Sequence, residues 1–152
     1  MDIKSFELEN LHEVHLMQTD QHKVIMFVAM FIMWGILYSI VNMTCTFKSL
    51  SIKNQNDTKN RIVSIIHGAV SFIWAITLYT PTPVFCQPNT YQETLLCMFS
   101  LAYSVYDLLA CIYYGLADAG LYIHHLSCAV GFGTGFFAGY GAIDGIGGLL
   151  IA

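Results

Sequence analysis

Charged residues are scarce in this chain. Only 11% of its 152 residues are Asp, Glu, Lys or Arg, whereas soluble domains carry about 25%. Hydrophobic residues make up 56% of the chain, and a soluble fold of this length has too small an interior to bury them. The composition therefore excludes a soluble domain and predicts an all-α, polytopic transmembrane helix bundle, with lipid covering the excess apolar surface.

Basic residues are also few, and they are confined to one part of the chain. All six Lys and Arg side chains lie within residues 1–61. Nucleic-acid binding calls for Lys and Arg clustered on one face, so no nucleic-acid partner is expected. Short basic loops stay on the cytoplasmic side of a membrane, which puts the 48–61 connection on that side.

Metal-binding and disulfide patterns are missing as well. The spacing of the five cysteines matches neither a disulfide framework nor a zinc site, which indicates small apolar packing residues. His124 and His125 are adjacent, so on a helix they point about 100° apart, whereas helical zinc motifs use i, i+4 pairs. We therefore predict no metal site and no cofactor.

Long apolar stretches dominate the remaining sequence. About 20 such residues cross a bilayer, and four stretches qualify, at 24–47, 62–80, 94–117 and 119–143. The apolar tail, 145–152, is too short to cross. We predict four complete spans plus a partial fifth, and expect the chain to be C-terminally incomplete or completed by neighbouring subunits. The predicted segments are an acidic N-terminal segment (1–23), a first span (24–47) and a membrane domain (48–152).

Four ionisable side chains interrupt these spans: His67, Asp107, His124 and His125. Such residues are costly in a membrane and usually face the interior of the bundle. At about 1.5 Å per residue, all four lie about 9–12 Å from one face. Because three separate spans bring polar groups to one level, we expect them to surround a shared polar cavity.

Helical spacing adds further polar residues to this cavity. Ser64, His67 and Ser71 are three and four residues apart and share one side of the second span. Tyr103 and Asp107 share a side of the third, and His124 belongs to a polar stripe on the fourth. The predicted lipid cavity is therefore lined by His67, Ser64, Ser71, Tyr103, Asp107, His124 and His125.

The chemistry of this constellation leaves two interpretations open. A histidine near neutral pH can accept a proton or act as a nucleophile, and an aspartate beside it can fix its tautomer and stabilise its charged form. That combination suits acyl transfer to an amine or hydroxyl of a lipid. It suits equally a buried His–Asp hydrogen-bond network that holds the helices together.

Glycines recur at every fourth position of the last span, at Gly131, Gly135 and Gly139. Small residues at this spacing let another helix backbone approach closely. We therefore expect these three glycines to mediate helix packing.

Three short runs add a resemblance to a known family. Residues 60–67 read NRIVSIIH, residues 102–109 read AYSVYDLL and residues 122–125 read YIHH. In order and spacing they resemble the TLC domain, which is named for translocating-chain-associated proteins, ceramide synthases and a neuronal lipofuscinosis protein. The resemblance covers about residues 48–152 and is closer to the small TLC-domain proteins, which are linked to membrane lipid composition.

The resemblance implies a helix bundle around a lipid-binding cavity, usually in the endoplasmic reticulum, and a role in membrane lipid homeostasis. Ceramide synthases of this family transfer an acyl group from acyl-CoA to a sphingoid base with paired histidines. By that similarity His124 and His125 are the candidate catalytic residues, with Asp107 in support. The alternatives are lipid binding without catalysis, N-acyl transfer, and a non-catalytic accessory subunit of a larger membrane complex.

Overall fold

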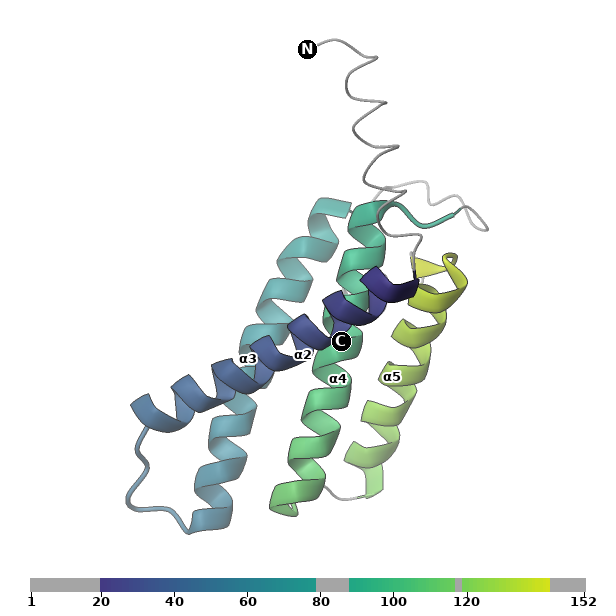
Figure 1. Cartoon of the computed structure of the whole chain (residues 1–152). Helices are drawn as coiled ribbons and strands as arrows, with labels where there is room; N and C mark the ends of the chain where they lie inside the picture. The colour runs from purple at the N-terminus through teal and green to yellow at the C-terminus, as the bar shows by residue number, and fades with distance from the viewer. Residues whose placement is uncertain (1–19, 79–87, 117–118, 143–152) are drawn as a thin grey trace, which may run out of the picture.

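The computed structural model describes residues 20–78, 88–116 and 119–142. They form four helices, α2 (Asp20–Thr44), α3 (Ile52–Leu78), α4 (Tyr91–Tyr114) and α5 (Ala119–Ala138). The helices α3, α4 and α5 lie side by side, and α2 crosses the bundle obliquely (Figure 1). The prediction of an all-α protein is confirmed.

Three of these helices, α2, α3 and α4, are long and apolar enough to cross a membrane. The 20-residue α5 falls short of that composition because it contains two histidines and several glycines within its length. The predicted partial fifth span, 145–152, lies outside the described residues, as does most of the acidic segment 1–23.

The helix α4 is the centre of the bundle. It packs against each of the other three helices, and 67% of its most apolar stretch is buried, compared with 17% for α2 and 22% for α3. Trp34 of α2, only 1% exposed, joins the helices by packing on Phe99 and Tyr103 of α4, with ring centroids 4.8 and 5.2 Å away.

Both ends of α4 have sequence signals that explain its bounds. At its start, the Thr90 side chain accepts a hydrogen bond from the backbone of Glu93, whose carboxylate accepts one from the backbone of Thr90, forming a capping box. At its end, Gly115 has φ 60, a left-handed conformation that glycine adopts without strain. These signals set the length of the helix that carries Asp107.

Two predicted boundaries differ from the structure. The loop expected in the 48–61 connection is wrong over most of its length, because α3 begins at Ile52. Two contacts stabilise the first, polar turns of α3. Arg61 forms an ion pair of 3.0 Å with Asp57, and Lys59 donates a hydrogen bond of 2.7 Å to Asn42 of α2. The fourth span was predicted to reach 143, whereas α5 ends at Ala138, where Gly139 has φ 72.

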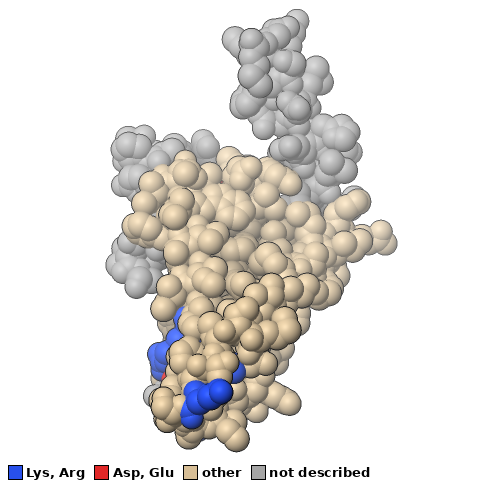
Figure 2. Space-filling view, turned by 90° about the vertical axis from the view of Figure 1, so that its left-hand side faces the viewer, with Lys and Arg blue, Asp and Glu red and all other residues tan. Residues whose placement is uncertain are grey.

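The surface of the described helices is consistent with a lipid environment. Many large hydrophobic side chains are exposed, such as Ile25 at 65%, Ile36 at 56% and Ile73 at 65%. On the face seen in Figure 2, the Lys and Arg side chains gather toward one end of the molecule. An apolar belt with basic residues at one end is typical of a membrane-spanning bundle.

Candidate functional site

A cavity of about 1360 Å³ lies between α3 and α5, which both pack on α4. Six of the predicted cavity residues line it: Ser64, His67, Tyr103, Asp107, His124 and His125. The seventh, Ser71, is fully buried and does not line the cavity; its hydroxyl lies 3.0 Å from Nε2 of His67. The lining also includes apolar side chains such as Ile65, Phe72 and Phe132.

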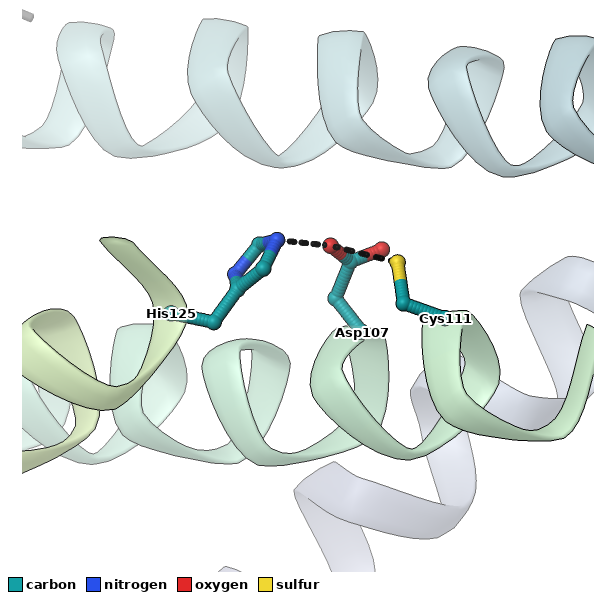
Figure 3. Close-up of side chains that lie close together, drawn as sticks. All are labelled: Asp107, Cys111 and His125. Atoms are coloured by element: carbon teal, nitrogen blue, oxygen red, sulfur yellow. Dashed lines mark hydrogen bonds and ion pairs between the residues drawn. The ribbon is translucent and has the colours of Figure 1, made fainter. Parts of the chain in front are cut away.

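Asp107 lines the cavity wall, and it is only 2% exposed. Its Oδ1 accepts a hydrogen bond from Nδ2 of Asn60 at 2.6 Å. Its Oδ2 lies 2.6 Å from Nε2 of His125 and accepts a bond from the Cys111 thiol at 3.9 Å. Figure 3 shows the Asp107 carboxylate between the His125 ring and the Cys111 sulfur.

The two adjacent histidines have different surroundings. His125 is buried beside Asp107, whereas His124 is exposed and its Nε2 lies 3.7 Å from the thiol of Cys128, one turn further along α5. Their rings are 5.4 Å apart and inclined at 69°. His125 therefore has a carboxylate that can orient it, and His124 is the more accessible of the two from the cavity.

His67 belongs to a second polar cluster. Its ring stacks on Tyr103 with centroids 3.9 Å apart, and its Nε2 lies 3.4 Å from the hydroxyl of Ser100. The Tyr103 hydroxyl in turn donates to Ser64 at 2.7 Å. These contacts join α3 to α4, so His67 has the surroundings of a structural residue rather than of a free base.

The three glycines of the last predicted span have three different environments. A Cβ on Gly135 would lie 3.4 Å from the Cys97 sulfur of α4, so this glycine marks a close helix approach. A Cβ on Gly131 would meet nothing within 4 Å, and this residue lines the cavity. Gly139 follows the end of α5.

Two residues in contact with Asp107 were not among the predicted site residues, Asn60 and Cys111. The sequence carries a signal for Asn60, because it precedes Ser64 by one helical turn and so continues the polar stripe of α3. Cys111 follows Asp107 by one turn of α4. Asp107, Cys111 and His125 form a group of potential metal ligands.

This arrangement is that of a polytopic membrane helix bundle with polar groups turned into a cavity between its helices. Comparison with family models finds a TLC domain at residues 57–152. The chain therefore belongs to the TLC-domain family, as its sequence motifs predicted. No curated protein matches the chain, and no solved structure matches it.

Proposed function

We propose that this TLC-domain protein binds a membrane lipid in the cavity between α3 and α5, and that it handles lipid there as part of membrane lipid homeostasis. The observation that carries the proposal is the cavity itself, about 1360 Å³ in volume. Pockets for drug-sized ligands measure about 300–1,000 Å³, so this one has room for a larger ligand.

The lining supports a lipid because it combines two kinds of surface. Ile65, Phe72 and Phe132 offer apolar contacts for an acyl chain, while the exposed His124 and Ser127 offer hydrogen bonds for a polar head group. Two of the lining side chains, Ile65 and Phe72, are themselves 70% and 45% exposed, so the cavity wall continues onto the apolar outer surface of α3 and a lipid can enter it from the bilayer. An endoplasmic reticulum membrane is the proposed location.

Co-purification of lipid with a variant that fills the cavity tests this proposal. Gly131→Leu places a side chain into the cavity where nothing lies within 4 Å of a Cβ. The matched control is Val130→Leu, since Val130 is the adjacent residue, is 60% exposed and does not line the cavity. Each protein is purified in detergent, and its bound lipids are extracted and identified by mass spectrometry.

The expected result is a lipid bound at about one per chain in the wild type and in Val130→Leu, and a loss of most of it in Gly131→Leu. Equal lipid in both variants would rule the cavity out as the binding site. A stoichiometric partner protein in place of lipid would instead favour the accessory-subunit alternative.

A second candidate function is N-acyl transfer from acyl-CoA, and the Asp107–His125 contact of 2.6 Å favours it. The carboxylate lies close enough to the imidazole to restrict its position, and a histidine placed in this way can take the proton of an attacking amine. The more exposed His124 is the candidate nucleophile. Acylation of a sphingoid base should be abolished by His124→Ala and by His125→Ala, and activity that survives both changes refutes catalysis by the pair.

A further inference from the structure

Three side chains of the cavity wall bring three different donor atoms together. The carboxylate of Asp107, the thiol of Cys111 and the imidazole of His125 have ligand atoms that all lie within 4.8 Å of one another. All three residues are buried, and Figure 3 shows them converging from α4 and α5. The adjacent histidine, His124, is not part of this cluster.

The contacts inside the cluster leave buried polar atoms without hydrogen bonds. Nε2 of His125 lies 2.6 Å from Oδ2 of Asp107, but the two atoms do not form a hydrogen bond. This buried nitrogen therefore has no hydrogen-bond partner among the described residues. The side chain of His125 is only 8% exposed. Oδ1 of Asn60, which lies beside the cluster, is likewise buried without a hydrogen-bond partner among the described residues.

The spacing and the surroundings are those of helical metal sites. Asp107 and Cys111 are four residues apart on α4, the separation that places two ligands on one side of a helix. Asn60 donates to Oδ1 of Asp107 at 2.6 Å, which leaves Oδ2 directed at the other two donors. Such a bond to a ligating carboxylate orients it and sustains metal affinity.

Charge identifies the class of ion. Metal binding would release the proton of the Cys111 thiol to water. The carboxylate and the resulting thiolate then carry two negative charges, which a divalent cation cancels, and an uncompensated charge is costly within a membrane helix. Mixed nitrogen, oxygen and sulfur donors suit zinc, whereas magnesium and calcium prefer oxygen donors alone. With bonds of about 2.0–2.3 Å, tetrahedral zinc holds its donors roughly 3.3–3.7 Å apart. The observed Asp107 contacts, 2.6 Å to His125 and 3.9 Å to Cys111, lie on either side of that range, so small movements of these side chains would bring the donors to zinc spacing.

The geometry points to a zinc site formed by Asp107, Cys111 and His125, with its fourth position open to the cavity. All three ligands line the cavity wall, and three protein ligands plus an open position is the pattern of reactive rather than purely structural zinc sites. The ion would bind with or without lipid, so this inference stands apart from the proposed lipid binding.

Cobalt replaces zinc as a spectroscopic probe in the test. The full chain, purified in detergent and stripped with a chelator, is titrated with Co²⁺, and the thiolate-to-cobalt charge-transfer band is recorded. One Co²⁺ per chain, a charge-transfer band and displacement by Zn²⁺ are expected. Cys111→Ser should lose the band, and Asn60→Ala should weaken binding about 10–100-fold. Cys45→Ser is the matched control, because Cys45 lies outside the cavity, and it should bind as the wild type does.

The inference would be overturned by a wild-type protein without the charge-transfer band, or by a band that persists in Cys111→Ser. The wild-type spectrum needs no variant, so it decides the question even if Cys111→Ser does not fold. His125→Gln provides a second check, since it should reduce Co²⁺ affinity at least 10-fold, and an unchanged affinity would also overturn the site.

Discussion

Nδ2 of Asn60 on α3 lies 2.6 Å from Oδ1 of Asp107 on α4, across 47 residues of sequence. Both side chains are buried, at 5% and 2% exposure. The carboxylate is thereby held between two neighbouring helices, with Asn60 at one oxygen and His125 at the other. This contact connects the polar wall of the cavity with the packing of the bundle, and it leads to the first prediction.

Replacing Asn60 by leucine should destabilise the protein. The change removes the donor to Asp107 and leaves a buried carboxylate oxygen without its partner, which costs about 1–3 kcal/mol. Thermal unfolding in detergent measures the loss. Asn54→Leu, at an exposed position two turns earlier on α3, is the control and should change stability by less than about 0.5 kcal/mol. Equal effects of the two changes would contradict the account.

The two adjacent histidines should differ sharply in their effect on stability. His125→Leu leaves Oδ2 of the buried Asp107 carboxylate without its 2.6 Å contact to the imidazole, and a buried polar group that loses its partner costs about 1–3 kcal/mol. His124 is exposed, so His124→Leu should cost no more than about 0.5 kcal/mol. Unfolding temperatures of the two variants, compared under one detergent condition, check the difference. A larger loss for His124→Leu than for His125→Leu would show that the pairing is wrong.

His67 should contribute to stability through packing. Its ring stacks on Tyr103 at 3.9 Å and packs edge-on against Trp34 at 5.6 Å. Removing a large buried side chain costs about 2–5 kcal/mol, so His67→Ala should lower the unfolding temperature clearly. Ile73→Ala on the same helix is the control, since Ile73 is 65% exposed. If both variants unfold at the wild-type temperature, the cluster around His67 does not stabilise the bundle.

Leucine at two glycines of one helix face should give opposite outcomes. At Gly135 the new side chain meets the Cys97 sulfur, because even a Cβ would lie 3.4 Å from it, and overpacking of this kind costs about 1–3 kcal/mol. At Gly131 the Cβ has open space, so Gly131→Leu should fold as stably as the wild type while reducing the cavity. Yield and unfolding temperature distinguish the two variants, and similar losses at both positions would contradict the described packing.

The helical class and the family followed from the sequence because they depend on local properties. Uncharged stretches of sufficient length predict spans, and motifs such as AYSVYDLL around Asp107 carry the family resemblance, which the match at residues 57–152 confirms. Helix ends were less predictable. The sequence suggested a loop within 48–61, yet α3 begins at Ile52. The polar first turns of α3 are stabilised by contacts with a neighbouring helix, such as Lys59 to Asn42 of α2, and sequence patterns do not show such contacts.

The partners of individual polar side chains were harder still to infer. Helical spacing placed Asp107 and His124 on polar faces, but it could not show that Asp107 contacts His125 and Asn60 while His67 stacks on Tyr103. Those contacts depend on how α3 and α5 are rotated against α4. The spacing of one helical turn puts Cys111 on the side of α4 that carries Asp107, but for the same reason it could not show which histidine of α5 lies beside the pair.

The most direct test of the central claim uses a membrane lipid that carries a photoactivatable diazirine on its acyl chain. The protein is labelled in lipid vesicles, and the modified residues are located by mass spectrometry. Binding in the cavity predicts labelling of the partly buried lining residue Phe132, with a strong reduction in Gly131→Leu. Labelling spread over the exposed outer face of α2, including Ile32 and Ile36, and unaffected by Gly131→Leu would contradict it.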